Sequence, residues 1–153
     1  MTSKTLFYSA LFVVFAICPG ISTSRLGASG GSTGTTASVT WPGTLGGNSS
    51  QAYGASSTGS FIVGYASNVS GQYRAFRWTA ASGMRDLGDF GYAFAEAYGV
   101  SGDGSVVVGQ AWDANFQQRA FRWTAAGGLQ DLGTLGGPYA EAAKVSANGL
   151  VIV

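Results

Sequence analysis

From residue 44 onward, short apolar runs alternate with turns rich in glycine, serine and aspartate. Runs such as 61–63 and 106–108 are apolar on both strand faces, which indicates a sheet that is covered on both sides. The turn Gly102-Asp103-Gly104 predicts a two-residue hairpin whose central residues both need a positive φ. Between residues 89 and 133 the pattern predicts three strands and one short strand, at 96–101, 105–111, 119–124 and 129–132.

The same pattern returns every 45 residues. The sequence Arg-Ala-Phe-Arg-Trp-Thr occupies 74–79 and 119–124, and an ungapped comparison of 44–88 with 89–133 gives 23 identities in 45 positions. A third, partial copy covers 134–153. Four strands in a repeat of this length match the size of a β-propeller blade. We therefore expect an all-β fold of propeller-like blades, about 2.4 of them, with an antiparallel β-sandwich as the alternative.

The chain before the repeats has a different composition. Residues 1–24 have the pattern of a secretory signal peptide, because Lys4 precedes a twelve-residue apolar run that small residues follow. The alternatives are a buried apolar segment, or a lipid anchor at Cys18, which the large residue before that cysteine disfavours. Residues 25–43 are a Gly/Ser/Thr-rich leader that we expect to be flexible.

This organisation predicts where the protein goes and how it is divided. An export signal places the protein in the periplasm, on the cell surface or outside the cell. The β-repeat region is expected to cover 44–153, divided into 44–88, 89–133 and the partial copy 134–153.

Residue counts exclude several kinds of chemistry. The chain of 153 residues has no histidine, only the cysteine at position 18 and a net charge of +1. A histidine base, a thiolate nucleophile in the repeats and a Cys/His zinc site are thereby excluded. A nucleic-acid-binding patch would have few basic residues to draw on.

The acidic residues recur with the repeat. Asp86 returns as Asp131, and Glu96 returns as Glu141. Recurrence once per copy indicates a scaffold, whereas a catalytic pair of carboxylates needs one asymmetric site. We expect no enzyme activity, no catalytic residue, no cofactor and no metal site.

Most aromatic residues of the repeats have a structural explanation. Phe76 and Trp78 lie two positions apart on a predicted strand, as do Phe121 and Trp123, and both pairs are expected in the core. Trp112 is different, because it falls in a predicted loop and its counterpart in the first copy is a serine. It is the candidate residue for stacking on a ligand.

The arginines suggest a strand register. If Thr79 pairs with Met84, Arg77 lies opposite Asp86, and the same register places Arg122 opposite Asp131 in the second copy. Cross-strand ion pairs of this kind contribute about 0.2–1 kcal/mol. The alternative is that these arginines bind an anion.

The repeated motifs resemble those of the HAF repeat family, a group of predicted extracellular bacterial repeat proteins. The resemblance rests on 74–78 with 83–88, and on 119–123 with 128–137, and extends over about 44–153. Arg74 and Arg119 stand where the family has histidine. The resemblance implies export and a repeated β architecture, and it carries no established catalytic residues to transfer.

Together these patterns predict a secreted or cell-surface β-repeat protein with a non-catalytic structural or interaction role, present here as a fragment of a longer protein. Its expected partners are a surface protein or a glycan, or a second copy bound through the exposed sheet edge. Contact with a membrane is expected only through an uncleaved signal segment, and no contact with nucleic acid is expected. The alternatives are an exported carbohydrate-active enzyme with its catalytic residues outside this chain, or a gene remnant without function.

Overall fold

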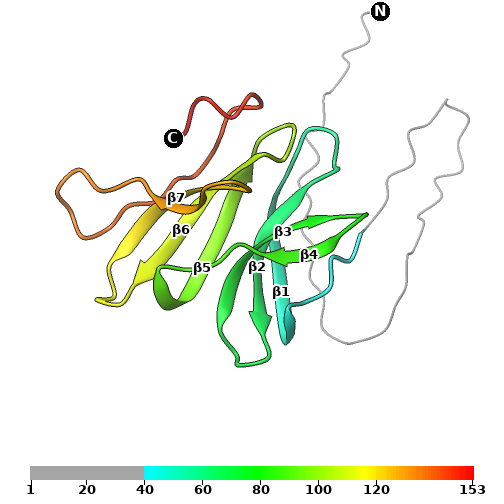
Figure 1. Ribbon diagram of the computed structural model, residues 1–153, viewed down its shortest axis with the longest axis horizontal. Coiled ribbons are helices and arrows are strands. Elements are labelled where there is room, and N and C mark those ends of the chain that lie inside the picture. Colours follow the sequence, from blue (N-terminus) through cyan, green and yellow to red (C-terminus); the bar gives the residue numbers. More distant parts are fainter. Residues whose placement is uncertain (1–39) are drawn as a thin grey trace, which may run out of the picture.

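The structure is a computed structural model that describes residues 40–153 (Figure 1). The regular elements in this range are all β-strands, so the expected all-β class is confirmed. None of the described residues belongs to a helix that could span a membrane. The predicted signal peptide at 1–24, and the leader as far as residue 39, lie outside the described residues.

Eight strands form two units of four. The first unit contains β1 (Gly46–Ala55), β2 (Ile62–Asn68), β3 (Tyr73–Thr79) and β4 (Gly83–Asp86). The second unit contains β5 (Gly91–Val100), β6 (Val106–Asp113), β7 (Gln118–Thr124) and β8 (Gly128–Asp131). Strands β5, β7 and β8 begin and end 45 positions after β1, β3 and β4. The repeat of sequence is therefore a repeat of structure.

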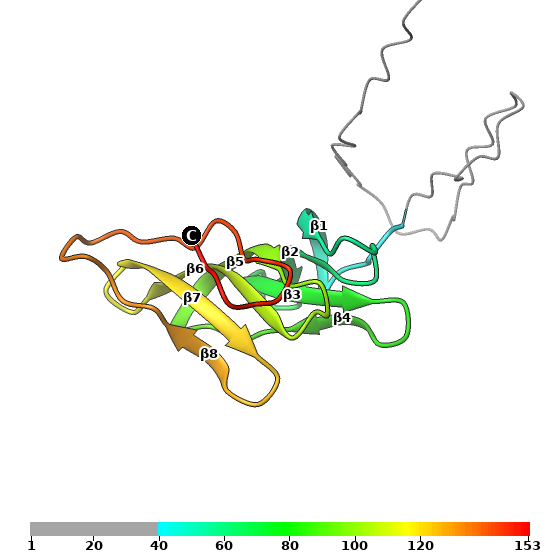
Figure 2. The ribbon, with the colours of Figure 1, turned by 90° about the horizontal axis from the view of Figure 1, so that it is seen from above.

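Within each unit the strands pair antiparallel in sequence order. The units meet where β3 and β5 pair in parallel through Tyr73 and Phe94. The result is one eight-stranded, mostly antiparallel sheet, which does not close on itself. In Figure 1 the units lie side by side, and in Figure 2 the C-terminal segment lies across β5 and β6.

The close approach of the first two strands is the same in both units. Each pair, β1 with β2 and β5 with β6, contains two register irregularities, and they occur at equivalent steps. A Cβ added at Gly64 would lie 1.9 Å from the carbonyl oxygen of Gln51, and one added at Gly109 would lie 2.0 Å from that of Glu96. Only glycine fits there, which explains why both positions keep it.

One turn is built in the same way in all three copies. In the second unit, the Ser101 N–H donates to the Val106 carbonyl at 2.9 Å, and the Gly104 N–H donates to the Ser101 carbonyl at 3.0 Å. The same two bonds recur in the copies before and after it, among Ser56, Gly59 and Phe61, and among Ser146, Gly149 and Val151. The partial copy therefore keeps the turn of the complete ones.

The conformation of this turn differs from the predicted hairpin. Gly104 has a φ of 69°, but Asp103 does not have a positive φ. Four residues, not two, separate Ser101 from Val106, and the Asp103 carboxylate accepts hydrogen bonds from the Ser101 hydroxyl at 2.7 Å and the Ser105 N–H at 3.0 Å. The expectation of two left-handed residues was wrong, because side-chain hydrogen bonds hold the first half of the turn.

Three of the four aromatic side chains predicted for the core are buried there. Phe76, Phe121 and Trp123 are buried, as expected, and Val63 and Val107 are buried with them. Trp78 is only half-buried.

The predicted register between β3 and β4 was wrong by one residue. Thr79 pairs with Gly83, which has a φ of 67°, so Arg77 lies opposite Arg85 and not opposite Asp86. In the second unit Arg122 lies opposite Gln130 and not opposite Asp131, and its guanidinium donates to the Gln130 side chain at 3.1 Å. The turn is one residue shorter than expected, because the glycine itself pairs across it.

Arg77 instead connects the two units. Its Nη1 donates to the Gly104 carbonyl at 2.6 Å, and its guanidinium carbon lies 5.4 Å from the centre of the Phe61 ring and 5.2 Å from that of Trp123. A Cβ added at Gly104 would lie 2.3 Å from the Phe61 ring. The turn of the second unit thus lies directly against the first unit, and Arg77 fills the space beside it.

The third copy packs on the second in a related way. A Cβ added at Gly149 would lie 2.9 Å from Val106, the residue equivalent to Phe61. The Ala142 N–H donates to the Gly109 carbonyl at 3.2 Å, and Ala142 is buried with Val108. The part of the third copy from residue 140 onward therefore packs on the second unit, whereas residues 135–139 are exposed.

Candidate functional site

Six aromatic rings form a continuous strip across the sheet. Neighbouring ring centroids lie 5.3–6.1 Å apart, and every contact is tilted or edge-on. Such contacts are a favourable arrangement for aromatic pairs. The strip includes, in order of contact, Tyr98, Tyr53, Tyr65, Tyr73, Phe94 and Trp112.

Trp112 is part of this strip and does not lie in a loop. It is the penultimate residue of β6, pairs with Gln118, and is half-buried against the Phe94 ring, at 5.7 Å between centroids. The loop expected to begin at Trp112 begins two residues later, after Asp113, whose side chain accepts the N–H groups of Asn115 and Gln117. The location predicted for Trp112 was wrong, and its role in stacking on a ligand stays a prediction.

Two tyrosines of the strip are held by one carboxylate. The Tyr98 hydroxyl donates to Glu96 Oε2 at 2.6 Å, and the Tyr53 hydroxyl donates to Glu96 Oε1 at 3.3 Å. Gln110 Nε2 donates to Glu96 Oε2 at 2.8 Å, and Gln110 Oε1 in turn accepts a hydrogen bond from Gln118 Nε2. Tyr53 belongs to the first unit, whereas Glu96, Tyr98, Gln110 and Gln118 belong to the second. The Glu96 carboxylate therefore connects the two units.

Burial and the carboxylate keep both hydroxyls protonated. Burial, followed by the negative charge of Glu96, raises the pKa of Tyr53 to about 12. Burial and the hydrogen bond to Glu96 raise the pKa of Tyr98 well above its usual range. Both phenols therefore stay neutral hydrogen-bond donors throughout the physiological pH range.

An open depression of about 430 Å³ lies beside these tyrosines. It is lined by Tyr53, Tyr98, Glu141, Ala143 and Lys144. Positions 53, 98 and 143 are spaced by 45 residues, so equivalent positions of all three copies meet there. Glu141 is the counterpart of Glu96, but it lies exposed at the side of the depression.

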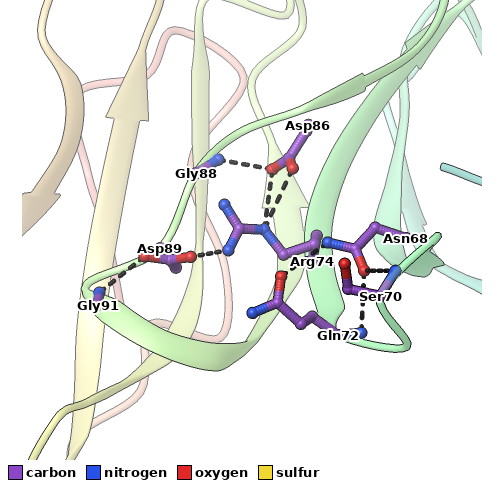
Figure 3. A network of polar contacts seen from close by, with 8 residues as sticks. All are labelled: Asn68, Ser70, Gln72, Arg74, Asp86, Gly88, Asp89 and Gly91. Atoms are coloured by element: carbon purple, nitrogen blue, oxygen red, sulfur yellow. Dashed lines mark hydrogen bonds and ion pairs between the residues drawn. The ribbon is translucent and has the colours of Figure 1, made fainter.

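Two other carboxylates, those of Asp86 and Asp89, bind backbone N–H groups and share one arginine. In Figure 3, Arg74 Nε contacts Asp86 Oδ2 at 3.1 Å, and its Nη1 pairs with Asp89. The two aspartates also accept the N–H groups of Gly88 at 2.8 Å and Gly91 at 2.7 Å. These side chains fix the connection that leads from the first unit to the second.

The second unit uses its equivalent residues differently. Asp131 accepts the Gly133 N–H at 2.7 Å, as Asp86 does for Gly88. Arg119, the counterpart of Arg74, pairs instead with Asp113 at 3.1 Å. The two arginines at the position where the resemblance expects histidine thus hold different loops.

Hydrogen bonds in the turns lower the pKa of two aspartates. The Ser101 hydroxyl, with the N–H and hydroxyl of Ser105, lowers the pKa of Asp103 to about 2. The N–H of Gln117 is the main cause that lowers the pKa of Asp113. Both carboxylates stay charged at neutral pH and serve as acceptors in the turns.

The tyrosine depression was not predicted from the sequence. The one signal in the sequence is the recurrence of Tyr53 as Tyr98 within the repeated Ala-Tyr-Gly, and the structure adds that Tyr53 is exposed. Within 40–153, no three His, Cys, Asp or Glu side chains gather closely enough to hold a metal ion.

Comparison of the chain with protein-family models, curated proteins and solved structures finds no match. The resemblance to HAF repeats therefore stays a prediction that rests on the quoted motifs, and the geometry described above is the basis for a functional proposal.

Proposed function

We propose that this protein is an exported, non-catalytic β-repeat protein whose units are arranged like propeller blades and present a face for interaction. Each unit has four antiparallel strands in sequence order, as a blade has. Equivalent positions 53, 98 and 143 lie around one depression. Equivalent positions on the innermost strands of a propeller meet around its axis in the same way.

The observation that carries the non-catalytic role is the use of the carboxylates. Five of the seven acidic side chains accept backbone N–H groups within turns or connections, namely Asp86, Asp89, Asp103, Asp113 and Asp131. A general acid or base must instead be free to exchange a proton with a substrate. This use of the acids favours a scaffold.

The interaction role is supported by the exposed part of the aromatic strip. Tyr53 and Tyr73 are 42% and 41% exposed, although both rings contact other rings of the strip. Aromatic residues that combine an apolar ring with a polar tip are enriched where proteins bind partners. Export is supported by the pattern of residues 1–24.

The experiment that tests this proposal follows the full chain, with a C-terminal tag, in the cells that encode it. We expect the tagged protein in the envelope or the medium, with its N-terminus near residue 25 by mass spectrometry. Purified protein is expected to adhere to isolated envelopes without releasing reducing ends from polysaccharides. A cytosolic protein with an intact N-terminus contradicts export. Release of reducing ends that is lost in Glu141→Gln contradicts the non-catalytic role and favours the carbohydrate-active enzyme.

A further inference from the structure

We infer that the depression between Tyr53 and Tyr98 binds one ring of a neutral, hydroxyl-rich carbohydrate. This inference rests on the proposed interaction function and assigns it to a site and a ligand class. The depression takes residues from all three copies, so it exists only where the copies pack together. The site therefore depends on the packing between copies and not on the local conformation of a single turn.

The two tyrosine rings form a rigid surface for stacking. Their centroids lie 5.4 Å apart, with 56° between the ring planes. Both hydroxyls donate to the same carboxylate, that of Glu96, which fixes the orientation of the rings before any ligand arrives. Fixed aromatic groups bind with little loss of conformational entropy. The apolar C–H face of a pyranose suits such a surface.

The edge of the depression supplies the polar groups that sugar hydroxyls need. Glu141 and Lys144 line it together and are both exposed. The Glu141 carboxylate can accept hydrogen bonds, and the Lys144 ammonium can donate them. A few polar groups beside an apolar surface determine the orientation of a ligand in a binding site.

The charges around the depression favour a neutral ligand. The carboxylates of Glu96 and Glu141 lie near Tyr98, where both raise its pKa, and they would repel a phosphate or another anion. A cation would meet Lys144 and would find Glu96 already accepting three hydrogen bonds. The depression is also open, so it cannot enclose a purely apolar molecule. A sugar ring has an apolar face that can stack on the tyrosine rings and hydroxyl groups that can bind Glu141 and Lys144.

Affinity electrophoresis of the purified full chain tests this inference. The gels contain one soluble neutral polysaccharide each (xylan, mannan, galactan or β-glucan), or the anionic polygalacturonate. We expect retardation by at least one neutral polymer and none by the anionic polymer. Retardation in none of the neutral gels, or only in the anionic gel, would overturn the inference.

Variants locate the binding on the molecule. Tyr53→Ala and Glu141→Ala are each expected to raise the dissociation constant by about tenfold or more, equivalent to about 1.4 kcal/mol. Tyr139→Ala is the matched control, because this ring is 70% exposed and does not line the depression. Glu141 is exposed, so its variant is expected to keep the melting temperature of the wild type. Binding that survives both site variants would place the ligand elsewhere and overturn the inference.

The inference and the proposed function can fail separately. If the chain adheres to envelopes but no neutral polysaccharide retards it, the sugar site is wrong and the interaction function stands. If the chain is retarded by a polysaccharide but is found in the cytosol, the site stands and the exported role is wrong.

Discussion

The two complete units share their strands and registers, but they differ in what lies against them. In the second unit the Gly104 turn packs on Phe61, whereas a Cβ added at the equivalent Gly59 would meet no atom within 4 Å. Trp123 is 3% exposed beneath Arg77 and Arg85, whereas its counterpart Trp78 is half-buried. Equivalent positions therefore lie in equivalent strands but are packed differently, because different neighbours lie against the two units.

The largest effect is expected from the two turn glycines. Gly104→Val forces a branched side chain into a left-handed conformation and into the Phe61 ring, which should cost about 3 kcal/mol or more. Gly59→Val has a similar φ, 71°, but no clash, and should cost about 1–2 kcal/mol. Urea denaturation measures both. Equal unfolding free energies would show that the contact between the units contributes nothing.

Gly59→Val is a better control for Gly104→Val than Asp113→Ala would be. The Asp113 carboxylate accepts two N–H groups and pairs with Arg119. Its removal would therefore unfold a loop as well as remove a charge.

The next effect concerns two equivalent arginines. Arg77→Ala removes a hydrogen bond to the Gly104 carbonyl and the contacts with two rings between the units. We expect a loss of about 2 kcal/mol. Arg122→Ala removes a hydrogen bond to Gln130 within one unit and should cost about 0.5 kcal/mol. Thermal unfolding of both variants makes the comparison, and a larger loss at Arg122 would refute the role given to Arg77.

A smaller effect is expected in the loop between the second and third strands of each unit. Phe116 has a φ of 59°, and the equivalent residue of the first unit is Gly71, with a φ of 76°. Phe116→Gly should stabilise the protein by about 0.5 kcal/mol, since glycine adopts this conformation without strain. Differential scanning calorimetry checks the sign. A lower melting temperature would mean that the contacts of the Phe116 ring outweigh the strain.

The smallest effect is a pH dependence of stability that we expect from the turn of the second copy, at Asp103, and not from the equivalent turns of the other copies. The folded pKa of Asp103 is lowered from 3.8 to about 2, so the stabilisation that it gives is present above pH 4 and is lost as the pH falls towards 2. Asp103→Asn should remove this acid dependence, because the other copies have Thr58 and Asn148 at the same position and neither titrates there. Stability measured between pH 2 and 5 in both proteins tests it. An unchanged acid slope would contradict the assignment.

Much of the fold could be predicted from the sequence, because it depends on contacts within one copy. The 45-residue spacing and the alternation of apolar runs with glycine turns predicted the eight strands and the burial of Phe76 and Phe121. The register of Arg77 was missed because Gly83, in a left-handed conformation, pairs across the turn itself.

The candidate site was harder to predict, because it is made between copies. Spacing along the chain places Tyr53 and Tyr98 at equivalent positions, but it does not say that their rings meet or that Glu96 binds both. Trp112 was expected in a loop, whereas strand β6 continues through Asp113, and the side chain of Asp113 holds the loop that follows. Sequence repetition predicts the units, and the packing between them must be observed.

The packing of the second unit's turn on the first unit is tested most directly by nuclear Overhauser contacts in the full chain. With Phe61 and Gly104 assigned, we predict strong cross-peaks between the Phe61 ring protons and the Gly104 α-protons, since the ring leaves no room for a methyl group there. Absence of these cross-peaks, in a protein whose Gly104 amide is still protected by the hydrogen bond within its own turn, would contradict the account.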